Sequence, residues 1–96
     1  MESVPVTIYT RSWCPYCQRA LALLQLRGIG YRELRLEDGP AVREEMIARS
    51  GRRTVPQVFI GDHHVGGSDD LAAIERSGEL DRLLAEHAQS ANQPTP

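Results

Sequence analysis

The chain has 96 residues, a length that fits one compact domain. Hydrophobic residues make up 41% of it, and the net charge of −2 gives no reason to expect a nucleic acid or a membrane surface as a partner. The apolar stretch at 4–9 is too short for a secretory core or a transmembrane helix, so we expect a cytoplasmic protein.

Apolar periodicity and turn residues predict one element after another. In chain order, the expected elements are a strand at 4–10, a helix at 15–27, a strand at 31–36, a helix from Pro40 to Gly51, a hairpin at 58–65, a helix capped at 68–70 and ended by Gly78, and a short helix around 80–84. This order predicts an α/β fold. A parallel βαβ unit with a right-handed crossover and an antiparallel hairpin would form a small mixed sheet flanked by helices.

The last part of the sequence differs from the rest in composition. Residues 89–96 are polar and poor in apolar side chains, which is typical of a flexible C-terminal tail. We therefore expect the folded domain to span residues 1–88.

A Cys-Pro-Tyr-Cys segment stands where the first strand should lead into the first helix. In a cytosolic chain of this size, such a pair indicates redox or metal chemistry. Pro15 suits the first helical position, so the N–H groups of Tyr16 and Cys17 should face the sulfur of Cys14. A helix N-terminus favours an anion, and Arg11 adds positive charge, so we expect Cys14 to react as a thiolate.

Cys17 follows Cys14 by one helical turn and lies on the apolar side of the predicted helix. We therefore assign Cys14 as the exposed nucleophile and Cys17 as the more buried resolving thiol. The alternative is half of a zinc site, but zinc generally needs four ligands. The sequence has no second C-x-x-C pair, and His63 and His64 are neighbours whose side chains should point to opposite faces of a strand. We expect no metal.

Three segments together resemble a dithiol glutaredoxin of the bacterial glutaredoxin 3 type. They are the run at 10–17 that contains Cys-Pro-Tyr-Cys, the triplet Thr54-Val55-Pro56, and the Gly-Gly-Ser-Asp-Asp-Leu run at 66–71. The similarity extends over residues 4–85. It implies a thioredoxin-like fold with a four-stranded sheet and a glutathione-dependent thiol–disulfide oxidoreductase. Glutathione would be the electron donor, and glutathionylated or disulfide-containing proteins would be the substrates of a monomeric enzyme.

The resemblance also implies where glutathione binds. Val55, extended before a cis Pro56, would pair its backbone with the cysteine unit of glutathione, as in strand addition. The N–H groups of Ser68 and Asp69 would bind the γ-glutamyl carboxylate at a helix N-terminus, and the Asp69 side chain would pair with the ammonium. Ser68 would also act as the N-cap. The implied glutathione-binding residues are Arg11, Tyr16, Arg43, Thr54, Val55, Pro56, Gly67, Ser68 and Asp69.

Arginines are the candidates for the opposite end of glutathione. Arg11 stands where relatives usually have lysine; it keeps the charge but presents a planar fork. Arg11 and Arg43 would attract the glycine carboxylate, and Arg52 and Arg53 could also reach it; a solvated surface charge is the alternative for each. Trp13 either shapes the surface that meets protein substrates or packs into the fold.

Two other functions compete with this interpretation. Some glutaredoxins hold an iron–sulfur cluster between two subunits, using the first cysteine and glutathione, although in the family a proline at the position of Pro15 disfavours the cluster. A glutaredoxin-like redoxin reduced by thioredoxin reductase is the other alternative. The combination of Arg11, the Thr54-Val55-Pro56 triplet and Asp69 favours glutathione.

Overall fold

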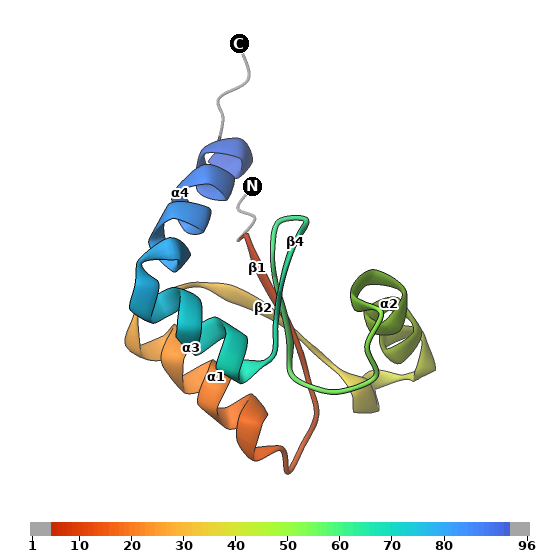
Figure 1. Ribbon diagram of the computed structural model, residues 1–96. Helices are drawn as coiled ribbons and strands as arrows, with labels where there is room; N and C mark the ends of the chain where they lie inside the picture. The colour runs from red at the N-terminus through yellow and green to blue at the C-terminus, as the bar shows by residue number, and fades with distance from the viewer. Residues whose placement is uncertain (1–4, 93–96) are drawn as a thin grey trace.

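The computed structural model describes residues 5–92, and in it a four-stranded sheet lies between helices on its two faces (Figure 1). In chain order, the elements are β1 (Val6–Thr10), α1 (Pro15–Leu26), β2 (Tyr31–Arg35), the short 3-10 helix η1 (Leu36–Asp38), α2 (Pro40–Ser50), β3 (Gln57–Ile60), β4 (His63–Gly66), α3 (Ser68–Ser77) and α4 (Glu79–Asn92).

The sheet has the strand order β2-β1-β3-β4. β1 and β2 are parallel and are connected through α1, while β3 is antiparallel to both β1 and β4. This is the predicted combination of a parallel βαβ unit and an antiparallel hairpin. Because β1 and β3 are antiparallel neighbours, the segment that follows β1 and the segment that precedes β3 lie at the same end of the sheet. The first cysteine and the Thr54-Val55-Pro56 triplet are on these two segments.

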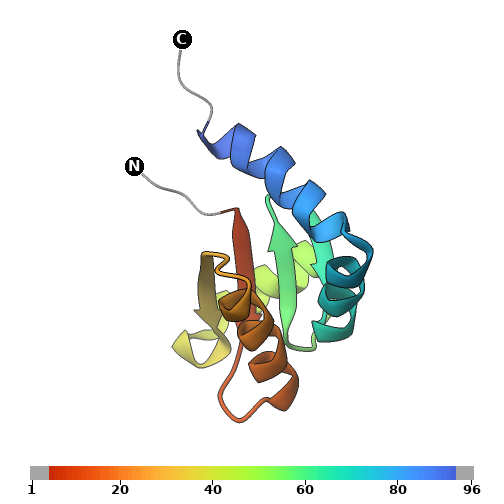
Figure 2. The ribbon, with the colours of Figure 1, turned by 90° about the vertical axis from the view of Figure 1, so that its left-hand side faces the viewer.

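Strand alternation divides the core between the two faces of the sheet. Val6 and Ile8 of β1 pack with apolar residues of α1, α3 and α4, whereas Tyr9 packs with Phe59 and with Met46 of α2. Figure 2 shows α1 and α3 in front of the sheet and α2 behind it. Apolar residues of α1 and α3 pack on this face of the sheet, and they hold the N-termini of both helices at the same end of the strands.

The C-terminal helix is longer than the sequence predicts. α4 continues to Asn92, so residues 89–92 of the expected tail are helical, and residues 93–96 lie outside the described residues. Glutamine and alanine are good helix formers, and no proline occurs between Glu79 and Asn92, so the local sequence allows the helix to continue. Between residues 5 and 92, no helix combines the length and apolar character that crossing a membrane requires.

Candidate active site

Cys14 is the N-cap residue of α1. Its backbone is extended, and its Sγ accepts a hydrogen bond of 3.1 Å from the N–H of Cys17. Pro15 occupies the first turn, where its missing N–H leaves no helical hydrogen bond unmade. One of the two N–H groups expected to face the sulfur therefore does so; the hydrogen bonds of residues 5–92 include none from Tyr16 to Cys14.

The two cysteines differ in burial, in the expected order. Cys17 is completely buried, whereas Cys14 is 8% exposed. The prediction that Cys14 is an exposed residue is wrong, because the loop before β3 covers it: Cys14 Sγ lies 3.9 Å from the carbonyl oxygen of Val55. What remains accessible is a small part of the side chain, which opens into a groove.

Burial also changes the acidity of the Cys17 thiol. Desolvation raises the pKa of Cys17 to about 12, and the hydrogen bond of its thiol to Cys14 adds to this; a backbone hydrogen bond and the charge of Arg11 act in the opposite direction. Cys17 is therefore a neutral thiol at physiological pH. Cys14 Sγ, which accepts the N–H of Cys17, is the sulfur of the pair that opens into the groove.

The loop that covers Cys14 contains a cis peptide bond between Val55 and Pro56, as the resemblance implied. Pro56 is buried, Val55 is half-buried and Thr54 is exposed, so the loop runs from the surface down to the start of β3. Gln57, the next residue, is 1% exposed, and its Nε2 donates to the carbonyl oxygen of Thr54 at 3.0 Å.

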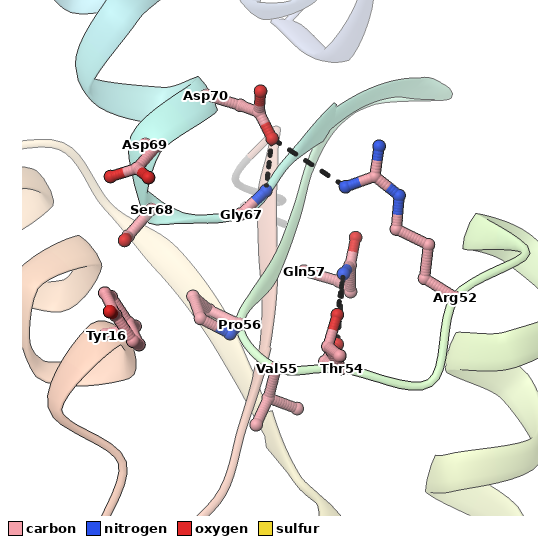
Figure 3. A pocket seen from close by; sticks show the side chains of 10 residues that line it. All are labelled: Tyr16, Arg52, Thr54, Val55, Pro56, Gln57, Gly67, Ser68, Asp69 and Asp70. Carbon is pink, nitrogen blue, oxygen red and sulfur yellow. Dashed lines mark hydrogen bonds and ion pairs between the residues drawn. The ribbon is translucent and has the colours of Figure 1, made fainter.

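The N-terminus of α3 lies next to Pro56 of this loop (Figure 3). Gly67, and not Ser68, is its N-cap residue; the predicted capping role of Ser68 is wrong. Asp70 serves instead, because its Oδ2 accepts the N–H of Gly67 at 2.9 Å. Gly66 has φ +118°, and a Cβ there would lie 2.2 Å from Asp70 Oδ2, so glycine permits this close approach.

Two adjoining hollows flank the loop. The one that we call the arginine hollow, of about 340 Å³, is lined by Arg11, Trp13, Cys14, Pro15, Tyr16, Leu36, Arg43, Arg53, Thr54 and Val55. The one that we call the α3 hollow, of about 220 Å³, is lined by Tyr16, Arg52, Thr54, Val55, Pro56, Gln57, Gly67, Ser68, Asp69 and Asp70 (Figure 3). Every residue predicted to form the site lines one of them except Cys17, which lies buried beneath.

The hollows differ in charge. Arg11, Arg43 and Arg53 surround the arginine hollow. The α3 hollow combines backbone N–H groups with two carboxylates, and across it Arg52 Nη1 lies 3.8 Å from Asp70 Oδ2. A ligand that spans both hollows would meet positive charge at one end and a mixed environment at the other.

Two aromatic residues edge the opening. Trp13 is 95% exposed and has φ +61°, so of the two alternatives left open for it, packing into the fold is excluded. Tyr16 is 54% exposed, and its ring lies 5.3 Å from the guanidinium carbon of Arg19. Both rings are therefore available to whatever approaches Cys14.

Sequence reasoning missed Gln57, Leu36 and Asp70 as lining residues. Gln57 could have been found because it is a single polar residue between Pro56 and the apolar strand residues that follow. For Asp70 the sequence predicts only a part in the helix cap at 68–70. Among residues 5–92, no three histidine, cysteine, aspartate or glutamate side chains are gathered as a metal site would require.

Comparison with known proteins agrees with this geometry. The family model described as Glutaredoxin matches residues 6–65. The chain is 56% identical to Glutaredoxin 3 of Escherichia coli over 82% of this chain and 95% of that protein. It is 52% identical to a glutaredoxin of Pseudomonas aeruginosa over 84% and 96%, respectively. The crystal structure of a buckwheat glutaredoxin–glutathione complex superposes with a TM-score of 0.79 at 34% identity, covering 88% of this chain and 80% of that one. The chain therefore belongs to the glutaredoxin family and is a thiol–disulfide oxidoreductase with a thioredoxin-like fold.

Proposed function

We propose that this protein uses glutathione as its electron donor and reduces glutathione mixed disulfides and protein disulfides. The observation that supports this most is the position of Cys14, whose accessible part opens into a groove with three arginines at one end and a helix N-terminus at the other. Glutathione is a tripeptide with one carboxylate at its glycine end and a carboxylate and an ammonium at its γ-glutamyl end. Its charges match the groove in one orientation.

In this orientation the glycine carboxylate lies in the arginine hollow, near Arg11 and Arg43. The γ-glutamyl carboxylate meets the N–H groups at the start of α3, and Asp69 takes the ammonium. The cysteine unit between them pairs with the backbone of Val55, next to Cys14. That a relative has been crystallised as a complex with glutathione supports the same assignment.

The first reaction is the removal of glutathione from a glutathionylated protein. The thiolate of Cys14 attacks the glutathione sulfur, a new S–S bond forms, and the old one breaks. The electron pair leaves with the substrate sulfur, which takes up a proton and becomes a thiol. A second glutathione, as thiolate, then attacks the mixed disulfide, so that oxidised glutathione leaves and the thiolate of Cys14 is restored.

The second reaction begins with a protein disulfide and needs Cys17. Cys14 attacks and forms a mixed disulfide with the protein, and Cys17 then displaces the protein thiolate and closes the Cys14–Cys17 disulfide. Since the pKa of Cys17 is raised to about 12, its proton must leave as it attacks, and the departing protein thiolate is the natural acceptor. Two molecules of glutathione reduce the intramolecular disulfide.

The test compares two electron donors on the same glutathionylated peptide. One assay contains glutathione, glutathione reductase and NADPH; the other contains thioredoxin reductase and NADPH. We expect turnover with glutathione, and at most a small fraction of that rate with thioredoxin reductase. Equal or faster turnover with thioredoxin reductase would contradict the proposed donor while leaving the oxidoreductase assignment intact.

A further inference from the structure

We propose that His64, on β4, is a positioning residue for the glutathione-binding loop, acting through the buried side chain of Gln57. Together the two side chains would fix the peptide plane between Thr54 and Val55, so that the N–H of Val55 is held ready for the extended backbone of the ligand. This inference rests on the proposed function and assigns a role to a residue outside both hollows.

A continuous chain of hydrogen bonds connects β4 with the loop. Gln57 Nε2 donates to the carbonyl oxygen of Thr54 at 3.0 Å and lies 3.3 Å from the Thr54 hydroxyl. At the other end of the same amide, Gln57 Oε1 lies 2.7 Å from His64 Nε2. Gln57 is 1% exposed, so its amide has little access to water as a substitute partner. Figure 3 shows the side chain of Gln57, one of the residues that line the α3 hollow, directed at Thr54.

The chemistry of the groups fixes the direction of each bond. A backbone carbonyl oxygen can only accept, so the NH₂ group of Gln57 must face Thr54. The amide oxygen of Gln57 then faces His64, and it too can only accept. His64 must therefore carry a proton on Nε2 and donate it. Without that donor, the oxygen of a buried amide would be left unpaired, or the amide would turn over and release Thr54.

The consequence for the ligand follows from peptide geometry. In residues 5–92 the cis bond is the one between Val55 and Pro56, so the bond between Thr54 and Val55 is trans. In a planar trans peptide the C=O and the N–H point in opposite directions. Because the carbonyl of Thr54 is drawn toward Gln57, the N–H of Val55 points away from it. No hydrogen bond among the described residues uses this N–H.

His64 itself is held in place by its neighbours. Its ring stacks on Phe59 with centroids 4.9 Å apart and planes 29° from parallel. The guanidinium of Arg49 lies 4.1 Å from the centre of the Phe59 ring. Burial lowers the pKa of His64, and the charges of Arg52, His63 and Arg49 act in the same direction while Asp70 opposes them. Both the neutral Nε2–H form and the protonated form donate through Nε2, so the bond to Gln57 persists across the pH range of an assay.

The test uses three substitutions of His64 and one of its neighbour. His64→Gln places an amide N–H at a reach similar to Nε2, His64→Asn is one carbon shorter and does not reach Gln57, and His64→Leu has no donor. His63→Leu is the matched control, because His63 is exposed and adjacent on the same strand. We measure KM and kcat for a glutathionylated peptide, the rate at which iodoacetamide alkylates Cys14, and Tm.

We expect His64→Leu and His64→Asn to raise KM about three- to tenfold, the equivalent of one lost hydrogen bond. We expect kcat and the alkylation rate of Cys14 to stay within about twofold, since Gln57 orients the ligand-binding backbone and not the sulfur. His64→Gln should restore KM, and His63→Leu should leave it unchanged.

The positioning role is contradicted if His64→Leu lowers Tm while KM stays at the value of the His63→Leu control. It is also contradicted if His64→Gln binds as poorly as His64→Leu, because ring shape and not the hydrogen bond would then matter. In either case a wild-type protein that turns over with glutathione leaves the proposed function standing. A wild-type protein that does not turn over with glutathione contradicts both.

Discussion

The two hollows beside Cys14 share Tyr16, Thr54 and Val55, yet they are built in different ways. The α3 hollow depends mainly on a local motif, in which Asp70 accepts the N–H of Gly67 three residues earlier. The arginine hollow is assembled from the loop after β1, from η1 and α2, and from the loop before β3. The first is encoded in a few consecutive residues, whereas the second exists only when the sheet has formed.

A carboxylate holds the chain in place at each hollow. Asp70 lines the α3 hollow itself. Glu37 lies next to the arginine hollow and joins η1 to the loop after β1, because it accepts hydrogen bonds from the N–H of Ser12, at 3.1 Å, and from the Ser12 hydroxyl. These bonds from Ser12 lower the pKa of Glu37 to about 2, with further contributions from its own backbone N–H and from Arg35. The difference in construction implies that substitutions should affect the two ends of the ligand separately.

The largest effect should come from the thiol that lies between the hollows. Cys14→Ser should abolish both reactions, with a loss of at least about a thousandfold, because an alcohol is neither an adequate nucleophile nor a leaving group at neutral pH. Cys17→Ser should retain removal of glutathione from a glutathionylated peptide and lose reduction of a protein disulfide. Coupled assays with each substrate measure this. A Cys14→Ser variant with substantial activity would refute the assignment of the nucleophile.

The α3 hollow should show the second largest effect. Asp69→Asn should raise KM for a glutathionylated peptide by about tenfold, because a charge-assisted contact with the γ-glutamyl ammonium is lost. A glutathionylated peptide whose γ-glutamyl amino group is acetylated tests this contact directly, because it carries no ammonium for Asp69 to pair with. For that ligand the wild-type protein and Asp69→Asn should have similar KM values. A tenfold difference that persists with the acetylated ligand would show that Asp69 acts in some other way.

The arginine hollow should respond more weakly and should depend on salt. Arg11→Gln and Arg43→Gln should each raise KM about two- to threefold at low ionic strength, and the difference should shrink as salt is added, since both side chains are exposed. Arg32→Gln, on the exposed edge strand β2, is the control for a change of net charge. An equal effect of Arg32→Gln would mean that the arginine hollow exerts only a general electrostatic attraction.

The smallest effect should come from the contact between Glu37 and Ser12, next to the arginine hollow, when the pH is lowered. Glu37 has a depressed pKa in the folded chain, so its contribution to stability is present above its ordinary value of 4.5 and is lost as pH falls toward about 2. Carboxylate chemical shifts followed by NMR should place its midpoint near 2. Ser12→Ala should move the midpoint upward, whereas Ser77→Ala, remote from Glu37, should not. An unchanged midpoint in Ser12→Ala would contradict the anchoring contact.

Much of the site could be predicted because the residues that carry its chemistry lie close together in the sequence, in short motifs. Cys14-Pro15-Tyr16-Cys17 predicted a helix start with a capped sulfur, and the order of burial followed from the apolar stripe of α1. The exposure of Cys14 was predicted wrongly, because its contact with Val55 joins segments that lie far apart in the sequence. The cap of α3 was predicted at residues 68–70; the role given to Ser68 within it was wrong, and Asp70 is the capping side chain.

The sequence by itself determined the order of the strands and helices along the chain, the mixed sheet, and the position of Cys14 and Cys17 at the start of α1, because hydrophobic periodicity and helix-capping chemistry act over a few residues. Only the tertiary structure decided what surrounds the thiol. Arg11, Arg43 and Arg53 come together because β1 and β3 are adjacent, and Gln57 links His64 to Thr54 because β3 pairs with β4. These are contacts between distant segments, and strand pairing is the physical event that makes them neighbours.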